Sequence, residues 1–283
     1  MMTDPLAIDE RTLTRLRDAR TVVAFTGAGI SAESGIPTYR DVKNGLWSKQ
    51  SFQQLASPEG FAANPKLVWN WYTVRRQQVL SGVQPNSGHQ ALVRLASYYP
   101  ELTVVTQNVD DLHTRAGSQN VVELHGNLFR FLCSQERRPV AYENPRDAEP
   151  LTIEAVERGE GAEPPACPDC GAPLRPDVVW FGETLPVDAY RLAEQKALNC
   201  DVFFVIGTSA VVYPAAALPH VARRAGALVI EVNPEKTAFT DRADVSLRGK
   251  AGDILPRLVE LITGAPPAPA GDPPAQATPP PAT

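Results

Sequence analysis

The sequence predicts an α/β protein built on a doubly wound, parallel, Rossmann-like sheet, with a smaller module inserted into it. Short apolar runs rich in valine and isoleucine alternate along the chain with helical patterns. The first of these runs leads directly into a glycine-rich turn, as the first strand of such folds does. Two stretches break the alternation, and we expect them to form the inserted module.

Six apolar runs are the predicted strands. Each is short and nearly continuous in apolar residues, which is typical of parallel strands covered by helices on both faces. They are residues 21–27, 102–108, 121–126, 201–209, 227–233 and 244–249. Residues 87–99, 186–198 and 214–226 have the pattern of crossover helices, so the sheet is expected to be doubly wound.

The predicted domain covers residues 1–263, and residues 264–283 form a tail. Within the domain, residues 38–85 are mostly helical in pattern, and residues 127–180 are irregular and hold three of the four cysteines. These two insertions make up the smaller module. The tail contains eight prolines in twenty residues and nothing to bury, so we expect it to be disordered.

Composition excludes several classes of function. The 283 residues are 43% hydrophobic and carry a net charge of −5 without a long basic run, which disfavours stable binding to nucleic acid or to an anionic membrane. No run has the length of a signal peptide core or a membrane span. Four cysteines do not make a secreted disulfide framework, so we expect a cytoplasmic protein, by default a monomer.

The glycine-rich turn that follows the first strand matches a dinucleotide-binding fingerprint. Gly27, Gly29 and Ala32 fit G-x-G-x-x-G/A, in which glycines permit close approach of the backbone to a pyrophosphate. A dehydrogenase would continue into a second strand that ends in an acidic residue. This chain continues instead with SGIPTYRDVKNGLWS, which disfavours hydride transfer.

Polar motifs follow four further strands, at the edge of the sheet where open α/β proteins bind ligands. They are TQNVDDLHTRAG (106–117), VVELHGN (121–127), GTS (207–209) and EVNPE (231–235). Together with GAGISAESGIPTYR (27–40), this ordered set resembles the sirtuin family of NAD-dependent protein deacylases. The resemblance extends from Leu16 to Ile262.

The resemblance implies that NAD is a co-substrate and that acylated lysines of proteins are the partners. In this family the acyl oxygen attacks the ribose carbon that carries nicotinamide, and the acyl group ends on ADP-ribose. His125 matches the general base, a role that suits the near-neutral pKa of imidazole. Asn108 matches a second catalytic residue, in the ribose environment.

The resemblance also implies a set of cofactor-binding residues. Arg40 matches an arginine beneath the cofactor, and Tyr39 replaces a phenylalanine that shields the reactive carbon. Asp111 is expected to remain a charge at a helix amino terminus. The full set is Gly27, Ala28, Gly29, Ile30, Ser31, Ala32, Tyr39, Arg40, Gln107, Asn108, Val109, Asp110, Gly207, Thr208, Ser209, Asn233, Pro234, Glu235 and Ala251.

The segment VVWFGETLP (178–186) resembles the family segment that pairs with the substrate peptide as an added strand. Its expected substrate contacts are Val179, Phe181, Gly182 and Glu183. A plain buried strand is the alternative interpretation.

Cys133, Cys167 and Cys170 are candidate ligands of a structural zinc ion, which would make the inserted module zinc-ribbon-like. The family normally supplies four such ligands, but Glu136 stands where the fourth cysteine is expected. Glu136 or water completes the site, or the site has lost zinc. Cys200 leads a core strand and is expected to be an ordinary buried thiol.

Tyr72 and Arg75 lie three residues apart in VWNWYTVRRQ, so a helix would place both on one face. One sirtuin branch that prefers succinyl and malonyl groups carries Tyr-x-x-Arg there, with Ala-Glu-Ser in the glycine loop. This chain has both, the second as Ala32-Glu33-Ser34. The resemblance therefore implies that Tyr72 and Arg75 bind an acyl carboxylate, and Arg76 is expected to be solvated.

Three other functions are compatible with the sequence. A plain protein deacetylase would use the same residues without reading a carboxylate. ADP-ribosyl transfer or NAD hydrolysis would need a blocked acyl-lysine channel. A non-catalytic NAD-sensing module would show decay at His125, Asn108 or Asp110, and all three are present.

Overall fold

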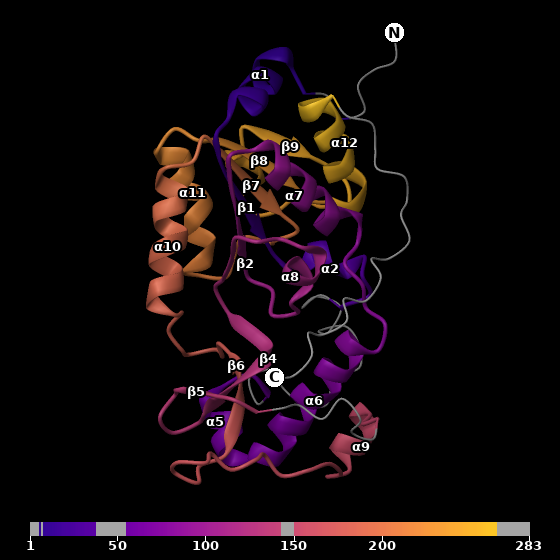
Figure 1. Cartoon of the computed structure of the whole chain (residues 1–283), viewed down its shortest axis with the longest axis vertical. Helices are drawn as coiled ribbons and strands as arrows, with labels where there is room; N and C mark the ends of the chain where they lie inside the picture. Colours follow the sequence, from indigo (N-terminus) through magenta and orange to yellow (C-terminus); the bar gives the residue numbers. More distant parts are fainter. Residues whose placement is uncertain (1–5, 7, 38–54, 143–149, 265–283) are drawn as a thin grey trace, which may run out of the picture.

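The computed structural model describes residues 6, 8–37, 55–142 and 150–264. A large region carries the parallel sheet, and a smaller module lies at its lower end in Figure 1. The predicted Tyr39 and Arg40, together with the predicted tail from residue 265, lie outside the described residues. Within the described ranges, no helix combines the length and apolarity that a membrane span requires.

The large sheet confirms the predicted fold class. All six predicted strands form, and they lie in the order β3-β2-β1-β7-β8-β9 with every neighbouring pair parallel. Their bounds are β1 Thr21–Thr26, β2 Glu101–Thr106, β3 Val121–Glu123, β7 Val202–Ile206, β8 Leu228–Val232 and β9 Val245–Leu247. The order reverses next to β1, so the loops after β1 and β7 border the switch point where such sheets bind ligands.

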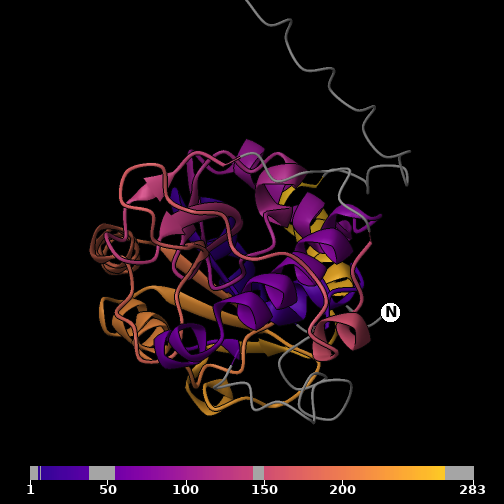
Figure 2. The same ribbon diagram turned by 90° about the horizontal axis from the view of Figure 1, so that it is seen from below.

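Helices cover both faces of this sheet, as Figures 1 and 2 show from two directions. One face packs against α1 (Glu10–Asp18), α7 (Ser87–Tyr98) and α12 (Ala251–Thr263). The other packs against α10 (Val187–Leu198) and α11 (Leu218–Arg224), which follows the short helix η1 (Ala215–Ala217). The short helices α2 (Ala28–Ala32), α8 (Leu112–Ala116) and η2 (Thr240–Arg242) lie in the connecting loops.

The small module contains an antiparallel sheet that the sequence did not predict. Its order is β5-β4-β6, with bounds β4 Gly126–Cys133, β5 Pro139–Val140 and β6 Leu174–Val178. Helices α5 (Pro58–Ala63), α6 (Pro65–Leu80) and α9 (Ile153–Glu157) complete the module. These strands are hard to recognise in the sequence, because their apolar residues are irregularly spaced and interrupted by prolines. In addition, β4 and β6 pair across some forty residues of sequence.

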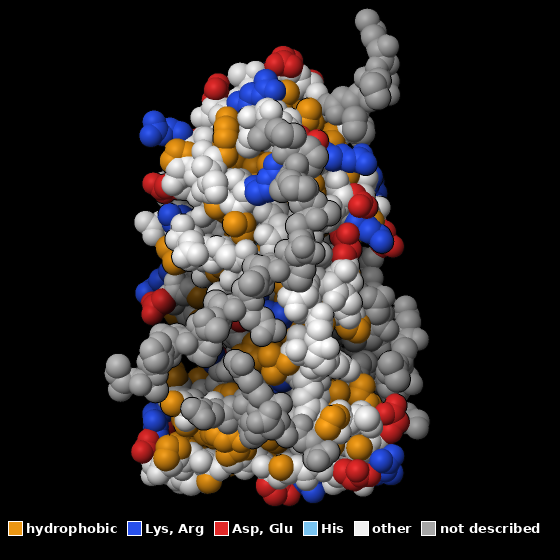
Figure 3. Space-filling view, turned by 45° about the vertical axis from the view of Figure 1, so that its right-hand side comes forward, with side chains coloured by type: hydrophobic (Ala, Val, Ile, Leu, Met, Phe, Trp, Pro, Cys, Tyr) orange, Lys and Arg blue, Asp and Glu red, His pale blue; other side chains and the backbone are white. Residues whose placement is uncertain are grey.

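Helix α6 forms the centre of the small module. Asn64 caps it, because its side chain accepts a hydrogen bond from the backbone N–H of Leu67. Five consecutive residues, 68–72, are buried, so the helix is surrounded by protein instead of lying on a surface. On the face drawn in Figure 3, hydrophobic side chains gather at the level of this module.

Candidate active site

The loops after β1 and β7 meet backbone to backbone, and glycines make this contact possible. The N–H of Gly29 donates to the carbonyl oxygen of Gly207 at 2.8 Å. A Cβ atom at Gly29 would lie only 2.7 Å from Gly207 Cα. Gly29 is therefore required for packing of the two loops, in addition to any role beside a pyrophosphate.

Asn108 is held at the mouth of this turn. Its Nδ2 donates to the Gly27 carbonyl and to Ser31 Oγ, both at 3.1 Å, and its backbone N–H donates to Thr106 Oγ1 at 3.0 Å. The amide oxygen has no partner among the described residues and remains available to accept from a ligand. The structure thus brings the predicted Gly27, Ser31 and Asn108 together.

A single backbone contact fixes the orientation of the His125 ring. Its Nδ1 lies 3.0 Å from the carbonyl oxygen of Gln107, which can only accept, so Nδ1 carries the proton and Nε2 keeps its lone pair. Burial lowers the pKa of His125 below its ordinary value of 6.5, although the bond to Gln107 acts in the opposite direction. The imidazole is therefore neutral at pH 7 and ready to accept a proton.

Asp110 lies deeper, with 5% of its surface exposed. Burial raises its pKa, while hydrogen bonds from Ser31 and the Leu112 N–H and the charge of Arg75 act to lower it. Asp111 lies at the amino terminus of α8, where its charge was predicted, but its side chain makes no capping hydrogen bond. Asp110 thus links the cofactor crevice to helix α6 of the small module.

The predicted adenosine-binding residues gather around Thr208. Its hydroxyl accepts from Gln107 Nε2 at 2.9 Å, and its carbonyl accepts from Asn233 Nδ2 at 3.1 Å. Pro234 and Glu235 are exposed on the same loop. Ala251 starts α12, and the next N–H, of Gly252, donates to Glu33 Oε1 at 3.0 Å. Glu33, predicted only as a branch marker, therefore ties this turn to the glycine loop.

Sequence reasoning missed the residue that fixes the loop after β8. Glu231 is fully buried, and one carboxylate oxygen accepts from Thr240 Oγ1 at 2.7 Å, Ser246 Oγ at 3.1 Å and Arg248 Nη2 at 3.0 Å. Arg248 also donates to the Glu235 carbonyl at 2.6 Å. The available signal was an acid inside the apolar run ALVIEVN.

Two further missed residues, His89 and His113, are buried beneath the crevice. Their rings lie 4.9 Å apart, and His113 Nε2 is 2.9 Å from the hydroxyl of Thr26. Burial lowers the pKa of His89 to about 4 and that of His113 to about 3. Both imidazoles are therefore neutral, and the Thr26 hydroxyl connects His113 to Thr106 at 2.8 Å.

Tyr72 and Arg75 lie on α6 beside Asp110. Tyr72 is 2% exposed, its hydroxyl accepts from Trp180 Nε1 at 2.9 Å, and burial raises its pKa to about 12. Arg75 is half-buried, with its guanidinium 4.8 Å from the centre of the Trp71 ring. Burial lowers the pKa of Arg75, and the charges of Tyr72 and Asp110 act in the opposite direction.

Arg75 has no hydrogen bond or ion pair with any residue in the described ranges. Trp71, whose ring lies under the Arg75 guanidinium, and Tyr72 both belong to the apolar cluster of the small module. A positively charged, partly desolvated group without a carboxylate partner favours the binding of an anion.

The prediction for Arg76 is wrong. Its side chain is fully buried, and its only hydrogen bond among the described residues runs from Nη2 to Thr73 Oγ1 at 2.7 Å. The guanidinium lies 5.0 Å from the Trp69 ring and 5.1 Å from the Phe131 ring, and burial lowers its pKa to about 10. Arg76 was expected to be a solvated neighbour of Arg75, but on this part of α6 the small module covers the side of the helix that carries Arg76.

The predicted peptide-binding segment is a turn that follows β6. Val179 donates its N–H to the carbonyl of His125 at 2.9 Å, and Phe181 is 48% exposed in the next turn with Gly182. The Glu183 side chain faces inward, where Arg175 Nη1 donates to it at 2.6 Å and Arg137 also pairs with it. Its carboxylate is therefore committed to the module, and its backbone N–H donates to the Trp180 carbonyl oxygen at 3.0 Å.

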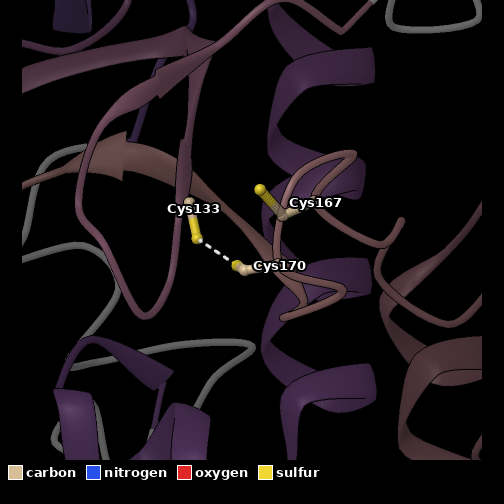
Figure 4. Close-up of side chains that lie close together, drawn as sticks. All are labelled: Cys133, Cys167 and Cys170. Atoms are coloured by element: carbon tan, nitrogen blue, oxygen red, sulfur yellow. Dashed lines mark hydrogen bonds between the residues drawn. The ribbon is translucent and has the colours of Figure 1, made fainter.

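The three cysteines predicted as metal ligands meet in one place, shown in Figure 4. Their Sγ atoms all lie within 4.8 Å of one another, with 3.4 Å between Cys133 and Cys170. Three thiols so arranged fit three positions of a tetrahedral zinc ion. Glu136 Oε2 instead accepts from Arg138 Nε at 2.6 Å, so it is not poised as the fourth ligand.

Cys170 is exposed, so solvent reaches one side of this cluster. The cysteines also lie far from the base, since His125 precedes β4 and Cys133 ends it. A strand of that length spans roughly 20 Å. Cys200 is a buried thiol in a different core cluster, as predicted, and burial raises its pKa to about 12.

Comparison with known proteins gives a consistent result. The Sir2 family pattern matches residues 27–214. An NAD-dependent protein deacylase of Methylococcus capsulatus is 48% identical over 262 residues, which are 93% of this chain and 100% of that protein.

Solved structures agree with the sequence relatives. A Sir2 homologue in complex with NAD has a TM-score of 0.80 and 44% identity, covering 91% of this chain and 94% of that one. A Sir2 complex with a p53 peptide and NAD has a TM-score of 0.72 and 32% identity, covering 90% and 99%.

Proposed function

This chain belongs to the Sir2 family, and we propose that it uses NAD to remove acyl groups from protein lysines, preferring acyl groups that end in a carboxylate. Succinyl and malonyl groups are the preferred substrates in this proposal, and acetyl groups are removed more slowly. The products are nicotinamide, the free lysine and O-acyl-ADP-ribose.

The half-buried, unpartnered guanidinium of Arg75 carries the acyl preference. It lies next to the Tyr72 hydroxyl in an apolar cluster, on the side of α6 that faces Asp110. An acetyl group would offer this guanidinium no hydrogen-bond acceptor and no charge beyond that of Asp110. A terminal carboxylate would accept a forked hydrogen bond from Arg75 and a further one from Tyr72.

The expected energetic gain decides between acyl groups. A hydrogen bond to a charged group contributes about 1.5–3 kcal/mol. One such bond therefore favours an acidic acyl group over acetyl by about one to two orders of magnitude in kcat/KM. The charge of Asp110 competes for the same guanidinium, so we expect the lower part of this range.

The residues of the crevice have separate tasks in this chemistry. NAD supplies the electrophilic ribose carbon and the leaving nicotinamide. His125 accepts a proton from a ribose hydroxyl at Nε2, because Gln107 holds the other nitrogen as a donor. Asn108 presents its free amide oxygen, and Asp110 its carboxylate, to hydroxyl and amide hydrogens of the co-substrate.

Cys133, Cys167 and Cys170 would hold zinc with solvent in the fourth position. The ion would join β4 to the turn before β6 and would supply no catalytic charge, given its distance from His125. Four free cysteines also fit the reducing cytoplasm that we propose as the compartment.

Mass spectrometry of the products tests this proposal. The protein is incubated with NAD and one peptide carrying succinyl-lysine, malonyl-lysine or acetyl-lysine. We expect NAD-dependent loss of each acyl mass, fastest for the acidic groups, together with O-acyl-ADP-ribose. If the peptides keep their acyl groups while NAD is converted to free ADP-ribose, the activity is NAD hydrolysis instead. If ADP-ribose is transferred to protein, the activity is ADP-ribosyl transfer.

A further inference from the structure

A basic groove runs along the outer side of α11, away from every residue assigned above. We define the basic groove by its six lining residues, Tyr213, Ala217, His220, Arg223, Arg224 and Arg242, around a volume of about 420 Å³. The groove is open to solvent and large enough for several side chains of a bound polypeptide.

Two elements bring the charges of the basic groove together. His220 and Arg224 lie four residues apart on α11, so they share one face of the helix. Arg242 comes from η2 on the opposite wall, and its Nη1 lies 3.5 Å from His220 Nδ1. The His220 ring packs edge-on against Phe239 with centroids 4.9 Å apart, which fixes its orientation.

The three arginines of the groove lack anionic partners. Within the described ranges, none of Arg223, Arg224 and Arg242 forms an ion pair with a carboxylate. Asp241, adjacent to Arg242 in sequence, pairs with Lys236 Nζ at 2.8 Å instead. Burial is the largest cause that lowers the pKa of His220, and the positive charges of all three arginines lower it further. The three guanidinium groups therefore all act on the same imidazole ring. A bound anion would relieve this repulsion.

The basic groove begins, along the chain, shortly after the loop that follows β7. Tyr213 lies four residues after the crevice residue Ser209 and is 67% exposed. Val211 and Val212, which join the two, are 58% and 41% exposed. A polypeptide that leaves the crevice along this segment would pass over Tyr213 and enter the groove between α11 and η2.

We propose that the basic groove binds an acidic stretch of the substrate protein, displaced along the chain from the acylated lysine. This inference rests on the proposed function, because it assumes that a protein segment occupies the crevice. Glu or Asp side chains of a polypeptide are favoured over a small anion, because the groove includes the exposed Tyr213, which follows the exposed Val211 and Val212, and a polypeptide can cover these apolar side chains. The groove would thus select among proteins, whereas Tyr72 and Arg75 select among acyl groups.

Direct binding tests the groove without any turnover. Fluorescein-labelled succinyl-lysine peptides are titrated by anisotropy in the absence of NAD, with four glutamates or four glutamines placed on either side of the lysine. We expect tighter binding of the glutamate peptide on one side only, by about fivefold at low salt, since exposed ion pairs contribute about 0.2–1 kcal/mol each. Salt should reduce this difference.

Matched variants locate the effect. Arg223→Gln with Arg224→Gln should abolish the preference for glutamate, whereas Arg11→Gln with Arg257→Gln, which removes two exposed charges elsewhere, should retain it. Equal binding of both peptides, or equal loss in both double variants, would overturn the proposal. Tighter, arginine-dependent binding of a labelled (dT)12 oligonucleotide would also overturn it and assign the groove to nucleic acid. Because no step requires NAD, failed deacylation leaves this result interpretable.

Discussion

The crevice at the edge of the parallel sheet and helix α6 of the small module differ in how their polar groups are satisfied. In the crevice, Gln107, Asn108 and Glu231 are fixed by hydrogen bonds to neighbouring loops. On α6, Arg75 and Arg76 are desolvated cations without a carboxylate partner in the described ranges. The crevice is therefore organised before its ligand arrives, whereas the module has an unmet requirement for an anion.

The two adjacent arginines show that this requirement is local. Arg75 is half-buried and faces Asp110 and the Tyr72 hydroxyl, so a ligand can reach it. Arg76 is fully buried between the Trp69 and Phe131 rings, so a ligand cannot. In the function that we propose, the crevice carries the common chemistry, and Arg75 alone of this pair selects the substrate.

The largest expected effect is at His125. Replacement of His125 by Ala removes the base and should lower kcat/KM for every acyl peptide by about 10²- to 10⁴-fold. NAD affinity, measured by calorimetry, should change little because the loops that hold NAD remain hydrogen-bonded. A variant that retains wild-type turnover would mean that another group accepts the proton.

The next largest effect is at Arg75. Arg75→Met should lower kcat/KM for succinyl peptides by about 10- to 100-fold, because at least one charge-assisted hydrogen bond is lost. Deacetylation should change far less. Steady-state kinetics on the two peptides measure both values, and equal losses would show that Arg75 acts through Asp110 and has a structural role.

The buried histidines beneath the crevice predict a pH effect on stability. His89 and His113 take up protons near pH 6.5 in the unfolded chain but only near pH 4 and pH 3 in the folded protein. The folded pKa values are depressed, so the free energy of unfolding is highest above pH 6.5 and falls as pH decreases toward these values. Each histidine contributes a slope of up to about 1.4 kcal/mol per pH unit.

Urea unfolding between pH 7 and pH 5 measures this slope. His113→Gln, which can still bond to Thr26, should flatten the slope by nearly one proton. His220→Gln is the matched comparison, because the pKa of His220 is also lowered but its ring is only partly buried on α11, so the slope should flatten less than in His113→Gln. An unchanged slope in His113→Gln would mean that His113 titrates alike in the folded and unfolded protein, and would contradict its lowered pKa.

The smallest effect is expected at Arg76. Replacement of a desolvated, unpaired arginine by an apolar side chain of similar length is often neutral or stabilising. Arg76→Met should therefore change the free energy of unfolding by no more than about 1 kcal/mol and leave the succinyl-to-acetyl ratio unchanged. Loss of more than about 3 kcal/mol in urea unfolding would mean that Arg76 has an anionic partner.

The parallel sheet could be predicted because its signals are local. Each strand is an apolar run, and in a parallel sheet the carboxyl ends of the strands meet at one edge, so the TQNVD and GTS motifs were correctly expected in one crevice. Each of these strands could be recognised from its local sequence, without knowing which distant residues it contacts. The antiparallel sheet of the small module did need it, since β4 and β6 pair across a long insertion.

The residues that were missed depend on tertiary contacts. Helical spacing placed Tyr72 and Arg75 together, but it did not show that α6 is enclosed and that Arg76 is buried. Glu33, Glu231 and His113 act by fixing loops that come from distant parts of the chain. Sequence identified groups with suitable chemistry, and their partners became visible only in the folded protein.

A competition between two substrates tests the central claim most directly. The wild-type protein is given NAD and an equimolar mixture of one peptide bearing either succinyl-lysine or acetyl-lysine, and both are followed by mass spectrometry in the same tube. If Arg75 and Tyr72 bind a terminal carboxylate, the succinyl peptide is consumed at least about ten times faster. Faster consumption of the acetyl peptide would contradict the assignment.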